Sequence, residues 1–274
     1  MKIKYLGTGA AEGWPGVFCN CQHCREAREK GGKNIRTRSS VLIDDDLMVD
    51  FPPDSYWHIV NYGIDASQIK HLVITHSHQD HFFIDDLKLR KPVFAHLEED
   101  NVLTIYGNKA VERIMTEVLN ENSDLKQYIG FCYTPPFETY MAGDIKVTPL
   151  LALHNRKEDC FIYMFEDKSG KRMLYGNDTG IFPDATWEYL EGYRFDLVSL
   201  DCTMGPLPEG TNHMGIPDNI EVKERMMKTG SADDNTRFIL THFSHNGGLL
   251  HDSLVEKAEP HGFEIAFDGF EVFI

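Results

Sequence analysis

The pattern of apolar and polar residues along the chain predicts strands that are each followed by a residue able to bind metal or transfer a proton. Short runs rich in Val, Ile and Leu are typical of buried β-strands. Because layered α/β folds place their sites at strand ends, we expect the polar residues that follow these runs to share one rim. They are Asp50 after 47–49, His76 after 72–74, His154 after 147–153, Asp178 after 173–175, Asp201 after 197–200 and His242 after 238–240.

Amphipathic helices are predicted between the strands. Strands and hairpins come first and strands then alternate with helices, which favours two mixed β-sheets packed together with helices outside. One apolar stripe recurs at the spacing of a helix face that packs against a core, and it consists of Val111, Ile114, Met115, Val118 and Leu119. Further helices are predicted over 21–30, 185–193, 219–229 and 249–259.

Composition narrows the class of protein. The chain has 274 residues, 42% of them apolar, and no linker-like segment, which predicts one large domain over 1–274. Its 27 basic and 43 acidic residues give a net charge of −16, which disfavours a nucleic acid polymer as a partner but not a small anionic substrate. No run resembles a membrane helix of about 20 apolar residues or the core of a signal peptide. We therefore expect a cytoplasmic protein with no membrane partner.

The densest group of candidate ligands is "THSHQDH", residues 75–81, directly after a predicted strand. Donors on a tight loop can face one point, whereas a continuing strand sends alternate side chains to opposite faces. Crowding of this kind indicates a metal site more than a polar turn.

This motif, followed by His154, Asp178 and His242, closely resembles the metallo-β-lactamase superfamily over nearly the whole chain. The resemblance implies an αββα sandwich with a dinuclear metal site along one edge. It also implies that one metal is held by His76, His78 and His154, that the second is held by Asp80, His81 and His242, and that Asp178 bridges them.

The types of donor atom in this set indicate which metals it binds and which reaction it supports. Five imidazoles and two carboxylates suit borderline divalent ions such as Zn²⁺ or Mn²⁺, so two such ions are the expected cofactors. Metals of this kind lower the pKa of bound water from about 15.7 to about 7, and a pair can clamp attacking and leaving oxygens. Hydrolysis by metal-hydroxide attack is therefore the expected reaction. Asp50 and Asp201 can orient ligand histidines from behind, although a capping role for Asp50 is equally open.

A second metal site is predicted near the N-terminus. Cys19, Cys21 and Cys24 lie too close together to pair sensibly as disulfides and are well spaced for one tetrahedral Zn²⁺. Either His23 or His245 can complete the set. Cys-x-Cys-x-x-Cys with a distant Thr-His-x-x-His resembles the PhnP branch of the superfamily, phosphodiesterases in which the equivalent residues hold a structural zinc, and this favours His245.

His213 lies in the Gly/Pro-rich stretch "GPLPEGTNHMG". PhnP-like enzymes have a histidine in this loop that protonates the leaving oxygen, so the resemblance implies that His213 is a general acid; the alternative is a surface histidine. We predict His213 and Asp80 as catalytic residues. The segments 206–217 and 131–140 are expected to line the substrate approach, and the glycines at 7, 9 and 13 to form a tight loop beside the metals rather than a dinucleotide site.

The predicted function is hydrolysis of a small cyclic or nucleotide-derived phosphodiester. A thioester hydrolase of the glyoxalase II kind and a tRNA 3′-processing nuclease share the ligand set, although the acidic charge counts against the nuclease. A di-iron oxidoreductase is the alternative from another class; such proteins typically have a glutamate where this chain has Gln79. The resemblance also suggests a homodimer.

Overall fold

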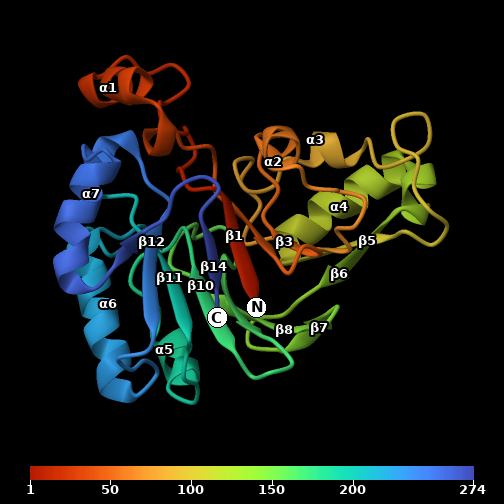
Figure 1. Cartoon of the computed structure of the whole chain (residues 1–274). Coiled ribbons are helices and arrows are strands. Elements are labelled where there is room, and N and C mark those ends of the chain that lie inside the picture. Colours follow the sequence, from red (N-terminus) through yellow and green to blue (C-terminus); the bar gives the residue numbers. More distant parts are fainter.

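Two seven-stranded β-sheets form the framework of the protein in the computed structural model, which describes residues 1–274 (Figure 1). In spatial order, the first sheet contains β14 (Glu271–Phe273), β1 (Lys2–Gly7), β2 (Ser40–Ile43), β3 (Leu47–Val49), β4 (His71–Val73), β5 (Leu103–Gly107) and β6 (Ile129–Tyr133). The second contains β13 (Glu264–Ile265), β12 (Arg237–Thr241), β11 (Leu197–Asp201), β10 (Arg172–Gly176), β9 (Phe161–Glu166), β8 (Ile145–Leu151) and β7 (Tyr140–Ala142).

Both sheets are mixed, as predicted. In the first sheet β14, β1, β2 and β3 pair antiparallel, and β3 to β6 pair parallel. The second sheet repeats this plan, because β7 to β10 pair antiparallel and β10 to β13 pair parallel. Each half of the chain therefore supplies a meander followed by parallel strands.

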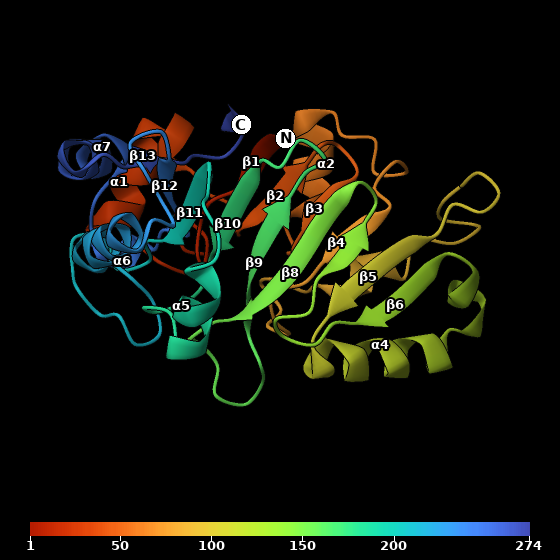
Figure 2. The same cartoon turned by 90° about the horizontal axis from the view of Figure 1, so that it is seen from below.

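Helices cover the outer face of each sheet (Figures 1 and 2). The first sheet is covered by α2 (Ser55–Tyr62), α3 (Ile84–Leu87) and α4 (Lys109–Glu121), and the second by α5 (Asp184–Leu190), α6 (Ile216–Thr229) and α7 (His251–Ala258). A further helix, α1 (Gln22–Lys30), lies at one end of the molecule beside α7. Short 3₁₀ turns cover Gly32–Asn34, Ser123–Gln127, His245–Gly247 and Glu259–His261.

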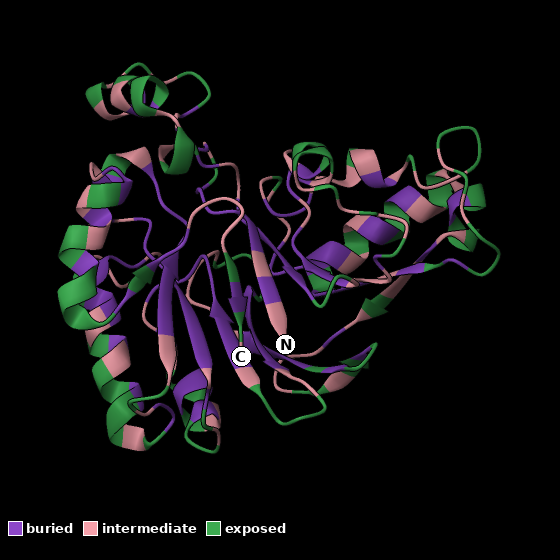
Figure 3. Ribbon diagram, viewed as in Figure 1, coloured by how far each residue is buried: buried purple, intermediate pink, exposed green.

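The central strands are buried on both faces, which explains their nearly continuous apolar runs. In β12, Ile239 packs between the sheets whereas Phe238 and Leu240 pack toward the helices. In β4, Val73 packs between the sheets and Leu72 toward α4. The buried strands and the exposed outer helix faces are visible in Figure 3. Three apolar interfaces separate four layers, so the predicted αββα sandwich is confirmed.

Capping residues set the helix boundaries. The Asn108 side chain accepts hydrogen bonds from the backbone N–H groups of Ala110 and Val111, so α4 begins at Lys109. The start of α6 is Ile216 rather than the predicted residue 219. Its first turn accommodates Pro217, and the Asp218 carboxylate accepts a 2.8 Å hydrogen bond from the N–H of Gly215. No helix combines the length and the apolar character that crossing a membrane would require.

Candidate active site

A polar cleft of about 410 Å³ opens where the strand ends meet. The polar residues that follow β4, β8, β10 and β12 all reach it, together with the loop after β1 and the loop after β11. A larger apolar hollow of about 540 Å³, between the first sheet and α2, contains none of the predicted metal ligands. The cleft is lined by Ala10, Ala11, Glu12, His78, Asp80, His154, Asp178, Thr203, Met204, His213, His242, Ser244 and Asn246.

Three site residues leave their strands with a left-handed backbone. The φ angles are +61° at Asp50, +51° at Asp178 and +60° at His242. Residues other than glycine rarely adopt this region, and such strain concentrates at functional sites. The chain here turns sharply directly after a strand, which allows the side chain to point along the sheet edge.

The first group of donors consists of His76, His78, His154 and Asp178, with ligand atoms within 4.8 Å of one another. His78 Nδ1 lies 2.9 Å from His76 Nε2 and 3.4 Å from His154 Nε2. One Asp178 oxygen, Oδ2, is 3.3 Å from His76 Nε2. The arrangement joins the loop after β4 to the loops after β8 and β10.

The second group consists of Asp80, His81, Asp178 and His242, again within 4.8 Å. His81 Nε2 lies 3.3 Å from an Asp80 oxygen and 3.2 Å from Asp178 Oδ2. His242 Nε2 is 4.0 Å from the same Asp178 oxygen. Asp178 therefore belongs to both groups, and all seven predicted active-site ligands come together.

The residues present fit divalent cations. His81 Nε2, His242 Nε2 and Asp178 Oδ1 are buried polar atoms without a hydrogen-bond partner, and such atoms in native proteins need an explanation. Bound ions would satisfy all three. The two groups can hold two ions that share Asp178, and their nitrogen and oxygen donors are those of Zn²⁺ or Mn²⁺.

The charges in the cleft are unevenly distributed. Burial lowers the pKa of His76 well below its usual value, and the neighbouring His81 charge adds to this. Burial acts against charging His81 too, but the carboxylates of Asp50 and Asp80 raise its pKa well above the usual value. Asp178 is buried as well, yet His242 and His213 lower its pKa well below that of a free carboxyl. The site thus combines stable carboxylates with imidazoles whose protons a metal can replace.

Two buried carboxylates support ligand histidines from behind. Asp50 Oδ2 accepts a 2.7 Å hydrogen bond from His81 Nδ1, and Asp50 Oδ1 accepts one of 2.8 Å from the Thr75 N–H. Asp201 Oδ2 lies 3.1 Å from His242 Nδ1, and the Thr203 hydroxyl lies beside the same nitrogen. Each carboxylate thus lies at Nδ1 of a predicted ligand histidine, and Nε2 of that histidine is left for a ligand in the cleft.

We expect Asp50→Asn to lower the affinity of the second metal group about 10- to 100-fold, because His81 loses the acceptor that fixes its ring and tautomer. Metal titration followed by calorimetry measures this. Asp45→Asn, at an exposed turn position, is the matched control. Equal affinities for the two variants would show that Asp50 only supports the fold.

His213 reaches the cleft from the loop after β11. Its Nδ1 lies 3.1 Å from Asp178 Oδ1 and 3.3 Å from Asp201 Oδ2. Burial disfavours the charged imidazole, but these two carboxylates raise the pKa of His213 to about 11. The loop therefore places His213 on the wall of the cleft beside the metal groups, and not on the open surface.

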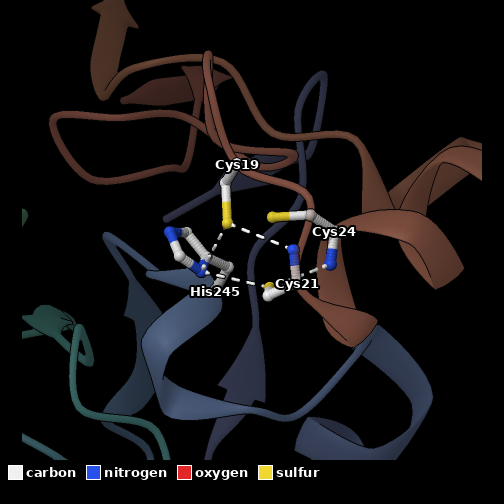
Figure 4. Close-up of side chains that lie close together, drawn as sticks. All are labelled: Cys19, Cys21, Cys24 and His245. Atoms are coloured by element: carbon white, nitrogen blue, oxygen red, sulfur yellow. Dashed lines mark hydrogen bonds between the residues drawn. The ribbon is translucent and has the colours of Figure 1, made fainter.

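The predicted thiol site is also assembled (Figure 4). His245 Nδ1 lies 3.6 Å from Cys21 Sγ and 3.8 Å from Cys19 Sγ, and the four residues can hold one ion. The alternative, His23, points instead at Gly248. Burial works against ionising Cys21, but N–H and S–H donors around its sulfur lower its pKa to about 7. Burial raises the pKa of Cys24 to about 12, so this thiol needs a bound cation to ionise.

Glu158 supports the site, and no sequence pattern predicts it. The Glu158 carboxylate accepts hydrogen bonds from the Ser77 N–H (3.0 Å) and hydroxyl (2.8 Å), and from the side-chain amides of Asn108 (2.9 Å) and Asn155 (3.3 Å). Ser77 stands between His76 and His78. Glu158 therefore holds the loop 75–81 in place through hydrogen bonds. These partners are distant in the sequence, and the fold brings them together.

The prediction that 131–140 lines the substrate approach is wrong, because none of these residues borders the cleft. Residues 129–133 form β6 at the sheet edge, and the Phe137 ring packs on Tyr189. The loop 206–217 contributes His213. The glycine loop after β1 does border the cleft, through Ala10, Ala11 and Glu12, and a Cβ at Gly7 would come within 2.0 Å of the Arg38 carbonyl oxygen.

Comparison with known proteins decides the family. The sequence model of the Beta-lactamase superfamily domain matches residues 56–243, more than half of the chain. The chain belongs to the metallo-β-lactamase superfamily. An octanoyltransferase from Porphyromonas gingivalis is 26% identical over 284 residues, covering 100% of this chain and 52% of that protein. This chain thus spans about half the length of that relative.

Solved structures share the metallo-β-lactamase fold. A diphosphatase from the PhnP family superposes with a TM-score of 0.76 at 23% identity, covering 100% of this chain and 97% of the other. Zn²⁺-bound PqqB from Methylobacterium extorquens gives a TM-score of 0.73 at 17% identity, with 100% of both chains covered. At these identities the likeness concerns the fold. Metallo-β-lactamase superfamily members are mostly hydrolases that bind divalent metals, and the two donor groups of this member fit such metals.

Proposed function

We propose that this metallo-β-lactamase superfamily hydrolase cleaves small phosphodiesters, of a cyclic or nucleotide-derived kind. The observation that carries the proposal is the position of His213, which lies 3.1 Å from Asp178 on the wall of the cleft that contains both metal groups. A phosphodiester needs cationic groups for its oxygens and a proton for its leaving alkoxide, and this cleft offers both. The similarity in fold to a PhnP-family diphosphatase supports the proposal.

Each residue of the site has a separate role in the proposed reaction. When bound, two divalent metals supply positive charge for the phosphate and lower the pKa of a water ligand to about 7. Asp178 keeps the two groups together, and Asp50 and Asp201 hold His81 and His242 in the tautomer that directs Nε2 into the cleft. His213, charged beside Asp201, donates the proton to the leaving oxygen. Asp80 contributes both a ligand oxygen and negative charge.

Zinc is the metal we propose for the thiol site, because three sulfurs and one imidazole are a frequent structural zinc set. For the active site we propose zinc or manganese, because both suit its imidazole and carboxylate donors; the Zn²⁺-bound PqqB structure shows that a protein of this fold binds zinc. The six cysteines are free thiols, which supports our placement of the protein in the reducing cytoplasm.

His213→Ala is expected to reduce kcat on a diester with a poor alkoxide leaving group by about 10²- to 10⁴-fold. The loss should be much smaller with p-nitrophenolate, which leaves without protonation. Steady-state rates on both substrates give the ratio. His96→Ala, an exposed histidine outside the cleft, serves as control. Equal losses on the two substrates would remove His213 as the proton donor.

A substrate screen tests the proposal as a whole. Protein reconstituted with Zn²⁺ or Mn²⁺ is assayed on bis(p-nitrophenyl) phosphate, nucleoside 2′,3′-cyclic phosphates, pre-tRNA and thioesters in parallel. Phosphodiester turnover that exceeds thioester turnover supports the proposal. Rapid thioester hydrolysis without phosphodiester cleavage would overturn it in favour of a glyoxalase II-like reaction, and strong visible absorption from bound iron would point to an oxidoreductase.

A further inference from the structure

Glu12 lies between the thiol site and the metal cleft. Its Oε1 atom accepts a 2.5 Å hydrogen bond from the Ser244 hydroxyl and lies 3.5 Å from His245 Nε2. The same side chain lines the cleft and remains 33% exposed there. The structure assigns two roles to this carboxylate: it fixes the ring of His245 for the thiol site, and it gives the cleft wall a fixed negative charge that selects the substrate. The second role rests on the proposed function.

The two ring nitrogens of His245 face different partners. Nδ1 faces the sulfurs of Cys19 and Cys21 (Figure 4). Nε2, the other ring nitrogen, lies 3.5 Å from Glu12 Oε1. A neutral imidazole offers a lone pair at one nitrogen only when the other carries the proton. A carboxylate accepts hydrogen bonds but does not donate them, so Glu12 keeps the proton on Nε2 and leaves Nδ1 free for a cation.

The position of Glu12 is fixed by the backbone around it. The Ala10 N–H donates to the Phe243 carbonyl (3.0 Å), and the Phe243 N–H donates to the Thr8 carbonyl (2.8 Å). The loop after β1 and the segment after β12 are thus tied together. Gly16 allows the approach from the other side, since a Cβ there would lie 3.2 Å from His245 Nε2. The contact between Glu12 and His245 follows from this framework and not from a flexible side chain alone.

Glu12 is the one carboxylate among the cleft-lining residues that belongs to neither metal group. Asp80 and Asp178 are used by metals when these are bound, whereas the Glu12 charge remains available to a substrate. Its neighbours on this wall, Ser244 and Asn246, are neutral. A hydroxyl group can donate to this carboxylate, but a second phosphate would meet charge of its own sign. The wall therefore suits a monoanionic diester whose remaining group is neutral and bears hydroxyls, such as a nucleoside.

Two substitutions separate the two roles. Glu12→Gln keeps an oxygen acceptor and removes the charge, whereas Glu12→Ala removes both. Glu29→Gln, on the exposed surface of α1, removes one charge away from the cleft and is the matched control. Circular dichroism first establishes that all variants are folded.

Cobalt binding measures the first role without any activity. Thiolate-to-Co²⁺ charge-transfer absorption arises only at the cysteine site, so its titration reports that site alone. We expect Glu12→Ala to weaken Co²⁺ binding there about 10- to 100-fold, and Glu12→Gln and Glu29→Gln to bind like the parent. Equal affinity for Glu12→Ala and the parent protein would overturn the positioning role.

A substrate pair measures the second role. The first substrate, thymidine 5′-(p-nitrophenyl phosphate), has a free 3′-hydroxyl. The second is the same compound phosphorylated at the 3′-oxygen, which adds negative charge at that position. The parent should prefer the hydroxyl compound in kcat/KM, and both Glu12 variants should lose about tenfold of that preference, while Glu29→Gln keeps it. An unchanged preference in Glu12→Gln would overturn the charge role. If the parent cleaves neither compound, the selectivity falls together with the proposed function, whereas the cobalt titration still decides the first role.

Discussion

Replacement of Asp178 by alanine is expected to lower the hydrolytic rate at least about 10⁴-fold and to release metal from both groups. Its two oxygens approach His76, His81 and His154 within 3.3 Å, and Asp178 is the one residue that the two groups have in common. Loss of a shared ligand removes both the positive charge that stabilises the transition state and the source of the nucleophile. Elemental analysis after gel filtration gives the metal content, and the screen substrates give the rate.

The control for this variant is Asp144→Ala, an exposed acid in the turn between β7 and β8. It should keep the metals and the rate of the parent protein. Three ions per chain in Asp178→Ala, the full complement of two cleft ions and one thiol-site zinc, would contradict the shared position of this carboxylate. A folded variant that loses its metals but keeps hydrolysis would contradict the metal-dependent reaction itself.

Cys21→Ser is expected to lose the zinc of the thiol site and with it several kcal/mol of stability, because structural zinc binding is coupled to folding. Activity should fall as well, since His245 and His242 are three residues apart and the same short segment serves both sites. Elemental analysis, thermal unfolding and the rate on bis(p-nitrophenyl) phosphate are measured together. We expect zinc to decrease by one ion per chain.

Cys132→Ser separates this effect from the loss of any thiol, because Cys132 is exposed on β6 and lies outside the cluster. It should match the parent protein in all three measurements. Zinc content unchanged in Cys21→Ser would remove the thiol site. Zinc loss with full activity would keep the site but refute its link to His242.

The sequence predicts the layers and the metal groups well, because both depend on local patterns. Strands buried on two faces produce apolar runs that stand out from helices, and a polar residue directly after such a run marks the sheet edge. The loop 75–81 alone contains four of the seven active-site ligands, His76, His78, Asp80 and His81. Family resemblance then orders His154, Asp178 and His242 into the two groups that the structure brings within ligand distance.

Features that depend on contacts between distant segments could not be predicted from the sequence. Helix α2 was not predicted because only Ser55 and His58 are buried along it, while Tyr56, Trp57 and Val60 are exposed, so its pattern lacks an apolar face. Glu12 and Glu158 stand in ordinary loop sequences, and their roles arise from partners 232 and 81 residues away. Spacing alone left two histidines open for the thiol site; the family resemblance favoured His245, and the geometry places it with the three cysteines.

The repetition of one strand plan in the two sheets has a consequence for how this protein acquires its chemistry. His76, His78, Asp80, His81 and the three cysteines follow or precede strands of the first sheet, whereas His154, Asp178, His213, His242 and His245 follow strands of the second. The thiol site and the two metal groups that contain the loop 75–81 each draw ligands from both sheets, whereas a fourth group of donors, Asp178, Asp201, His213 and His242, comes from the second sheet alone. None of the first three sites is completed by one half of the chain, so tight ion binding there would show that the two halves have docked, and the bound ions would in turn crosslink the two sheets.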